Sequence, residues 1–182
     1  MGNTVQPFKS KADRAKMRKA LQGRDQLLFT LGIHLGLRIS DLLTLRVGDL
    51  RGQRELTINE SKTGKPRRIK LSAQVHKEMK SVTAPDDDFI FRRKRGDKNE
   101  AITRVQAYKI LNAAAERAGI AANIGPIGCH SLRKTHGWLL HEKDVHITRI
   151  AKMLNHSSIE VTEKYIGITD DEIDGYYELI EI

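Results

Sequence analysis

The segment LNHSSIEVTEKY, residues 154–165, joins two predicted helices through a short polar turn. Apolar residues leading into it recur at i, i+3, i+4 and i+7, which is typical of the buried face of a helix. They are Ile147, Ile150, Ala151 and Leu154. Ser157 or Ser158 can cap the second helix, because a serine hydroxyl accepts a hydrogen bond from a free first-turn amide. A tyrosine at helical spacing is usually a core residue, so Tyr165 alone predicts only a packing corner.

The rest of the chain predicts an α+β fold that is mainly helical, with one small antiparallel sheet. Apolar periodicity near 3.6 indicates helices over residues 11–22, 24–34, 38–47 and 72–82, after Thr103, and from 129 almost to the end. Between residues 55 and 71 the period changes to two, and the turn-forming run KTGKP at 62–66 separates two strands. This pattern predicts a β-hairpin with a basic tip. Residues 1–10 lack periodicity and are interpreted as a linker or disordered end.

The net charge of +9 is unevenly distributed along the chain. Residues 170–182 hold six of the 23 acidic residues and no lysine or arginine, so residues 1–169 carry a net charge of +15. An excess of this size favours a polyanionic partner. We therefore prefer nucleic-acid binding to the alternative of a surface tuned only for solubility.

Composition argues against several classes of protein. Cys129 is the only cysteine, which excludes an intrachain disulfide framework and a thiolate zinc cluster. No run approaches the roughly 20 apolar residues that span a bilayer, and the N-terminus lacks the apolar region of a secretory signal. We expect a cytoplasmic protein with no membrane partner.

Five places hold residues suited to chemistry, and each is a weak signal alone. Arg38 and Asp41 lie three apart on a predicted helix, a spacing equally typical of a surface ion pair. Lys62 lies in a turn, where lysines are usually solvated. His130 and Arg133 open a helix after a Gly/Pro loop, and a histidine there can be purely structural. The other two places are His156 and Tyr165, which lie in the segment LNHSSIEVTEKY.

The order and spacing of these residues change that interpretation. The order is Arg, Lys, His-x-x-Arg, His, Tyr, at Arg38, Lys62, His130, Arg133, His156 and Tyr165. The lysine follows the first arginine by 24 residues, the second histidine follows the second arginine by 23, and the tyrosine follows by nine more. With the strings GLRISDLLTL, SKTGKPRRIKL and LNHSSIEVTEKY, this set resembles the tyrosine site-specific recombinases of the phage integrase type.

The resemblance covers roughly residues 24–168 and has two departures. Asn155 stands where the family usually has glycine, and Lys134 stands where a second histidine is common. Neither is a catalytic position. The resemblance implies that residues 11–169 form the family's helical catalytic domain.

The resemblance also implies a role for each residue of the set. Tyr165 is the implied nucleophile on a DNA phosphate, and His130 is the base that takes its proton. Lys62 would protonate the leaving 5′-oxygen. Binding of the phosphate oxygens falls to the remaining three residues, Arg38, Arg133 and His156.

Four further residues are predicted to bind DNA, and Asp41 is expected to orient Arg38 or His130. The predicted DNA-binding residues are Lys65, Arg67, Arg68 and Lys134. No cofactor or metal is implied: there is no phosphate-binding loop for ATP, and bond energy is kept in the 3′-phosphotyrosine link.

The implied partners are double-stranded DNA and further copies of the chain. Members of the family act as tetramers on DNA, so we expect a homotetramer there and a monomer in free solution. We expect that the N-terminal clamping domain of larger members is missing from this chain. The acidic segment 170–182 is expected to dock either on its own domain or on a neighbouring subunit.

Three alternatives remain open from the sequence. Residues 148–166 also fit a helix-turn-helix of a non-catalytic DNA-binding regulator. Five histidines between residues 130 and 156 suggest a zinc enzyme, although no HExxH pair is present. A type IB topoisomerase or a telomere resolvase shares the same catalytic logic, with a different outcome.

Overall fold

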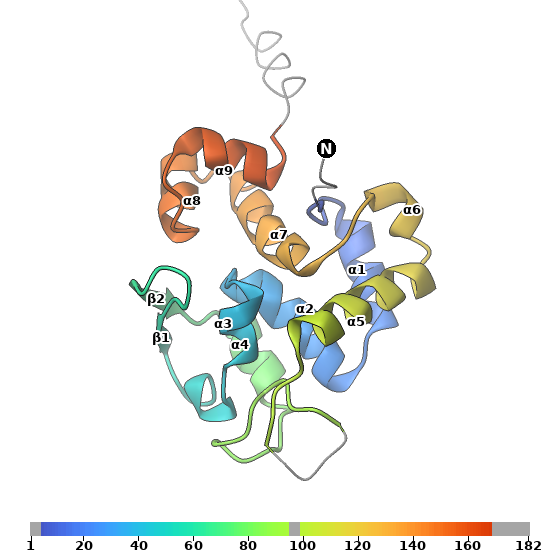
Figure 1. Cartoon of the computed structure of the whole chain (residues 1–182), viewed down its shortest axis with the longest axis vertical. Coiled ribbons are helices and arrows are strands. Elements are labelled where there is room, and N and C mark those ends of the chain that lie inside the picture. Colours follow the sequence, from blue (N-terminus) through green and yellow to red (C-terminus); the bar gives the residue numbers. More distant parts are fainter. Residues whose placement is uncertain (1–4, 95–98, 169–182) are drawn as a thin grey trace, which may run out of the picture.

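The structure is a computed structural model that describes residues 5–94 and 99–168 (Figure 1). Helices dominate the described part, and one two-stranded antiparallel sheet accompanies them. In chain order the elements are α1 (Lys11–Ala20), α2 (Gly23–Leu35), α3 (Ile39–Leu43), the 3₁₀ helix η1 (Val47–Asp49), β1 (Glu55–Asn59), β2 (Pro66–Lys70), α4 (Ala73–Met79), α5 (Arg104–Arg117), α6 (Ala121–Ile124), α7 (Cys129–His141), α8 (Ile147–Met153) and α9 (Ile159–Ile166). The predicted fold class is confirmed.

The predicted hairpin is formed by β1 and β2. Their register pairs Glu55 with Lys70 at one end and Asn59 with Pro66 at the other. The Glu60 amide donates to the Lys65 carbonyl at 3.0 Å and continues the ladder into the loop. Residues 60–65 therefore form the tip, which lies close to the α8–α9 end of the molecule in Figure 1.

Helix α2 runs through the middle of the domain (Figure 1). Its residues Leu28 and Leu31 belong to one core cluster, and Phe29 and Ile33 belong to another. Residues 28–33 of α2 are all buried, and a helix segment that is buried on all sides is apolar on all sides, which explains why its pattern is only weakly amphipathic. The partner on one side is α7: a Cβ atom added to Gly32 would lie 2.5 Å from Leu132 Cδ1.

Serine and threonine caps begin the helices where the sequence predicted them. The Ser72 hydroxyl accepts from the Val75 amide, and the Thr103 hydroxyl accepts from the Gln106 amide. Of the two serines considered before α9, Ser158 is the cap, accepting from the Val161 amide at 3.2 Å. Each cap satisfies one amide that the first turn leaves unpaired.

Helices α7, α8 and α9 meet around a small core of their own. Ile150, Leu154 and Ile166 are fully buried there. The close approach depends on Gly137 in α7, where an added Cβ would lie 2.5 Å from Ile166 Cγ2. The apolar stripe predicted from the sequence thus fixes α8 and α9 against α7, with the polar turn 155–158 between them.

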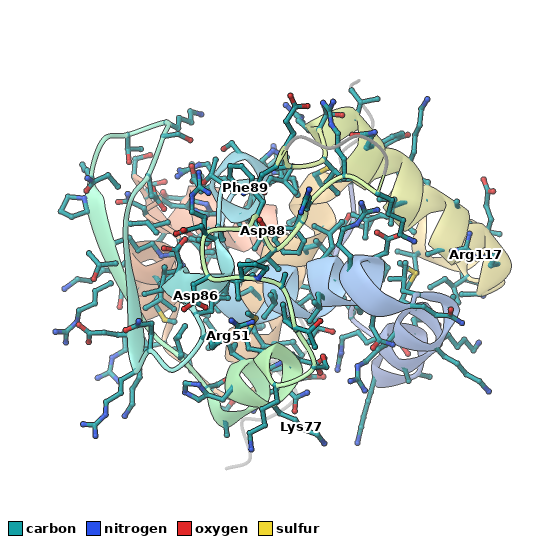
Figure 2. The ribbon with its side chains drawn as sticks, turned by 90° about the horizontal axis from the view of Figure 1, so that it is seen from below. Arg51, Lys77, Asp86, Asp88, Phe89 and Arg117 are labelled. Atoms are coloured by element: carbon teal, nitrogen blue, oxygen red, sulfur yellow. The ribbon has the colours of Figure 1, made fainter. Side chains whose placement is uncertain are left out.

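The segment between α4 and α5 is tied back to the residues that follow η1. The Arg51 guanidinium donates to Asp86 Oδ1 at 2.7 Å and to the Val82 and Ala84 carbonyls at 2.7 Å each. Arg51 and Asp86 lie next to each other in Figure 2. Arg51 thus ties this Pro/Asp-rich loop to the residues that follow η1, alongside the backbone bonds from the Val47 amide to the Asp88 carbonyl and from the Gly48 amide to the Asp86 carbonyl.

The prediction of a linker or disordered end at residues 1–10 is wrong for its described part, residues 5–10. Phe8 is fully buried and packs edge-on against Phe29, with 5.3 Å between ring centroids. Its amide donates to Thr135 Oγ1 at 2.8 Å. The Gln6 amide donates to the Pro126 carbonyl at 2.9 Å. These partners lie more than 20 residues away, so no local pattern revealed them.

Two further predictions concern the ends of the chain and the membrane. The predicted acidic segment 170–182 lies outside the described residues. None of the helices in the described ranges is long and apolar enough to cross a bilayer.

We predict that Phe8→Ala lowers the free energy of unfolding by about 3–5 kcal/mol, because it removes a buried ring and leaves a cavity. Urea denaturation followed by circular dichroism measures the change. Val105→Ala is the control, because Val105 is 61% exposed and its substitution should alter stability by less than about 0.5 kcal/mol. Equal midpoints for Phe8→Ala and the wild type would contradict the placement of residues 5–10 in the core.

Candidate active site

The phenol of Tyr165 in α9 lies among side chains from α7 and from the turn before α9. Its hydroxyl is 3.3 Å from Nδ1 of His130 in α7. The His156 ring, from the turn before α9, stands edge-on to the phenol with 4.7 Å between centroids. The Lys134 ammonium lies 5.1 Å from the phenol centroid. The second helix of the LNHSSIEVTEKY segment therefore presents Tyr165 to the start of α7.

The protonation states of this pair suit proton transfer from Tyr165 to His130. Burial raises the pKa of the Tyr165 phenol, and the charges of Arg133 and Arg38 offset this only in part. Burial and the nearby cations, led by Arg104 and Arg133, lower the pKa of His130. The resting pair is thus a neutral phenol beside a neutral imidazole, which with its proton on Nε2 accepts at Nδ1.

His156 is held by the start of the helix that carries the tyrosine. Its Nδ1 lies 3.1 Å from Thr162 Oγ1, and the Thr162 hydroxyl is fully buried. Burial, followed by the charges of Arg133 and Arg38, lowers the pKa of His156 to about 4. An added negative charge beside these arginines would reverse part of that effect.

Arg133 is fixed by backbone carbonyls from both sides of the site. Its Nη1 donates to the Gly36 carbonyl at 2.8 Å, and its Nη2 donates to the Leu154 carbonyl. Burial lowers its pKa to about 10, so the guanidinium stays charged at neutral pH. A 2% exposed arginine needs such partners, because an unpaired buried charge is strongly destabilising.

A buried carboxylate that the sequence analysis did not single out connects the two arginines. Glu60 is fully buried. Its Oε2 accepts from Arg38 Nη1 at 2.5 Å, and its Oε1 lies 3.3 Å from Arg67 Nη1 and 3.9 Å from Arg133 Nη1. Burial alone would raise the pKa of Glu60, but hydrogen bonds from Asn155 and Arg38 and the charges of Arg38 and Arg133 lower it to about 2.

A signal for Glu60 was present in the sequence. In a strand every second side chain points to the same face, so Glu60 continues the face that carries Leu56 and Ile58 in β1. Leu56 is 3% exposed. An acidic residue in register with an apolar face predicts a buried carboxylate with cationic partners.

The comparisons with known proteins agree with this geometry. Residues 9–172 match the phage integrase family. The chain belongs to this family. The probable integrase/recombinase YoeC of Bacillus subtilis is 36% identical over 180 residues, which cover 96% of each protein. The tyrosine recombinase XerA of Pyrococcus furiosus is 28% identical over 150 residues, or 80% of this chain and 51% of that protein.

Solved structures show the same fold. The crystal structure of XerA recombinase aligns with a TM-score of 0.74 and 18% identity, over 97% of this chain and 66% of that one. The catalytic domain of bacteriophage HP1 integrase aligns with a TM-score of 0.61 and 19% identity, over 96% and 94%. The chain spans about half the length of several curated relatives, XerA of Pyrococcus furiosus among them.

The structure differs from the sequence prediction at Arg38 and Asp41. Arg38 precedes α3 as its N-cap, with extended backbone, instead of lying on the helix. The Asp41 carboxylate accepts from the amide of Ser61 at 3.0 Å and from its hydroxyl, and these bonds replace the expected contact with Arg38 or His130. Asp41 therefore holds the hairpin tip.

The four predicted DNA-binding residues fall into two groups. Lys65 is exposed, and Arg68, whose side chain is 75% exposed, lies 3.5 Å from the carboxylate of Glu55. Arg67 points inward to Glu60 and donates to the Leu35 and Gly36 carbonyls. Lys134 is 5% exposed. Arg67 is thus engaged within the protein and Lys134 is buried, and the binding of these two residues to DNA stays a prediction.

Lys62 is exposed at the hairpin tip. Its side chain makes no hydrogen bond or ion pair with another described residue. Across residues 5–94 and 99–168, no three His, Cys, Asp or Glu side chains gather as ligands for a metal ion.

We predict that His156 titrates near pH 4 in the folded recombinase, because the folded pKa is depressed below the ordinary value of 6.5. The unfolded chain then binds more protons between pH 6.5 and 4, so this residue stabilises the fold above pH 6.5 and the contribution is lost as pH falls through that window. NMR titration of the histidine rings, with His156→Gln to assign the signal, measures the midpoint. A midpoint at or above 6.5 would show that the ring is not buried beside charged arginines.

Proposed function

We propose that this recombinase cleaves and rejoins double-stranded DNA at a specific site through a 3′-phosphotyrosine intermediate. The observation that carries the proposal is the 3.3 Å approach of the Tyr165 hydroxyl to His130 Nδ1. This pair lies beside two arginines that are fixed before any substrate arrives. Nucleophile, base and cations in one place are what attack on a phosphodiester requires.

The arginines stabilise the charge that develops on the phosphate. Two of the five N–H groups of Arg133 donate to backbone carbonyls. The other N–H groups would donate to phosphate oxygens. Arg38 presents a second guanidinium from the start of α3. Planar guanidiniums bind phosphate oxygens bidentately, which an ammonium does not. Fixed donors of this kind typically contribute about 2.7–4 kcal/mol each.

Two proton transfers accompany the exchange of bonds. As the Tyr165 oxygen bonds to phosphorus, its proton passes to His130. As the bond to the 5′-oxygen breaks, Lys62 donates a proton and the product is a free 5′-hydroxyl. A general acid or base in such a step is typically worth about 10²–10⁴-fold in rate.

Strand exchange follows from the same chemistry run backwards. A 5′-hydroxyl from a second DNA end attacks the phosphotyrosine and gives its proton to Lys62. As the bond from phosphorus to the Tyr165 oxygen breaks, His130 returns its proton to Tyr165, and the phosphodiester is restored. One phosphodiester replaces another, so the reaction needs no ATP. No step requires a metal ion, since the cations that hold the phosphate are side chains.

The partners belong to the same proposal. Residues 1–169 carry a net charge of +15, which favours DNA binding that weakens steeply with salt. We propose a monomer in free solution, a homotetramer on two DNA duplexes, and a cytoplasmic location. A tetramer supplies the four tyrosines that exchange of four strands requires.

We predict that the protein forms a covalent adduct on a nicked DNA substrate whose short 5′-ended fragment diffuses away after cleavage. The substrate carries the protein's recombination site, and the reaction contains excess EDTA. A band that resists denaturant on gels should form with the wild type and be lost in Tyr165→Phe. Tyr108→Phe is the control, because Tyr108 is 49% exposed on α5 and lies outside the catalytic group.

Adduct formation by Tyr165→Phe at the wild-type level would refute the assignment of the nucleophile. A non-catalytic DNA-binding regulator would form no adduct in any variant. Loss of the wild-type adduct in EDTA would contradict the metal-free mechanism.

A further inference from the structure

The hairpin tip is anchored on both sides of Lys62. On one side, Asp41 accepts from the Ser61 amide and hydroxyl. On the other side, Asn155 Nδ2 donates to Glu60 Oε2 at 2.9 Å and lies 3.5 Å from Thr63 Oγ1. The Thr63 hydroxyl in turn donates to Glu60 Oε2 at 3.2 Å. Residues 60, 61 and 63 are therefore held, and residue 62 lies between them.

Asn155 is well suited to reach the hairpin from the α8–α9 turn. It is one of two non-glycine residues in the described ranges with positive φ, at 53°. Asparagine tolerates this left-handed conformation better than most residues, and its amide supplies donors that glycine lacks. The residue before it offers its carbonyl to Arg133, and the residue after it is His156. The turn therefore contacts the phosphate-binding group and the hairpin at once.

Lys62 depends on such an anchor more than the other catalytic residues do. The side chains of Tyr165, His156 and Arg133 have partners within the domain, whereas Lys62 has none among the described residues. A lysine carries about 2 kcal/mol of rotamer entropy on a flexible stem. Its average position therefore follows the backbone of the tip.

We propose that Asn155, Glu60 and Thr63 form a latch that positions Lys62 for proton donation to the leaving 5′-oxygen. The inference rests on the proposed function, in which Lys62 is the general acid. The three are positioning residues, since they act through the backbone of residue 62. The latch also couples the acid to the phosphate site, because the same Glu60 carboxylate accepts from Arg38 at 2.5 Å.

The hydrogen bonds of the latch do not depend on pH near neutrality. The pKa of Glu60 is lowered to about 2, mainly by hydrogen bonds from Asn155 and Arg38 that outweigh the effect of burial, so its carboxylate is ionised and accepts at neutral pH. Asn155 is uncharged, so its donation is independent of pH. Positioning of Lys62 by these residues therefore adds no pH dependence of its own to the rate.

The test uses a leaving group that needs no proton. A thiol has a pKa of about 8.5, whereas an alcohol is roughly as weak an acid as water, near 15.7. A DNA substrate with sulfur in place of the bridging 5′-oxygen is therefore cleaved without a general acid. Loss of Lys62 positioning should slow cleavage of the oxygen substrate and leave cleavage of the sulfur substrate unchanged.

Two variants open the latch from opposite sides. Asn155→Gly keeps the positive φ and removes the donor, and Thr63→Val removes the hydroxyl at nearly constant volume. We expect each to cleave the oxygen substrate about tenfold more slowly than the wild type, a fraction of the 10²–10⁴-fold typical of a general acid. On the sulfur substrate both should match the wild type within about twofold, and DNA affinity should be unchanged.

Two controls calibrate the comparison. Lys62→Ala should be slow on oxygen and fast on sulfur, because it removes the acid itself. Arg38→Ala should be slow on both substrates, because it acts on the phosphate. Equal slowing of the latch variants on both substrates would show that they act on the arginines or on the fold. No slowing on either substrate would show that the latch has no role in cleavage. Either result overturns the inference.

Failure of the proposed function has a different signature. If the wild type forms no adduct on either substrate, the nucleophilic mechanism fails. If Lys62→Ala cleaves the sulfur substrate as slowly as the oxygen substrate, Lys62 is not the general acid. The proposal that the latch positions it is then also refuted.

Discussion

The buried carboxylate of Glu60 is the contact on which the rest of the site depends. Three guanidiniums converge on it, from Arg38, Arg67 and Arg133. Without a central anion these like charges would repel one another in a poorly solvated space, where breaking a buried pair typically costs about 3–5 kcal/mol. Each guanidinium comes from a different element. One carboxylate therefore fixes the positions of the hairpin, the start of α3 and helix α7 relative to one another.

The hairpin shows what this contact achieves. A two-stranded sheet is marginally stable by itself in water, and the outer face of this one is exposed. Its attachment to the helices consists of Leu56 in the core, Glu60 among the arginines, and Arg67 on the last carbonyls of α2. Gly36, in left-handed conformation with φ 57°, ends α2 and offers one carbonyl to both Arg67 and Arg133. A side chain there would collide with His136.

The sequence could predict the fold class, and it also indicated the six residues proposed for catalysis, because both depend on local order and spacing. Periodicity shows which face of a helix is buried, and the six residues proposed for catalysis follow a fixed order along the chain. It did not predict the Asp41 bonds to Ser61, the inward course of Arg67 or the burial of Phe8. Each of these depends on a partner brought near by the fold, 127 residues away for the Phe8 amide and Thr135. A basic residue in a strand has the same local pattern whether it faces solvent or a buried carboxylate.

In the proposed reaction, the negative charge of the DNA phosphate changes the pKa values of the two histidines and of the Tyr165 phenol. In the free protein Arg133 and Arg38 lower the pKa values of both active-site histidines and also oppose the burial effect on the Tyr165 phenol. A bound phosphate brings a negative charge to these guanidiniums and offsets their fields. The histidines then become more basic, which makes His130 a better proton acceptor. The phenol becomes harder to ionise by itself. Attack therefore requires transfer of the proton to His130, and binding of DNA creates the basicity that this transfer needs.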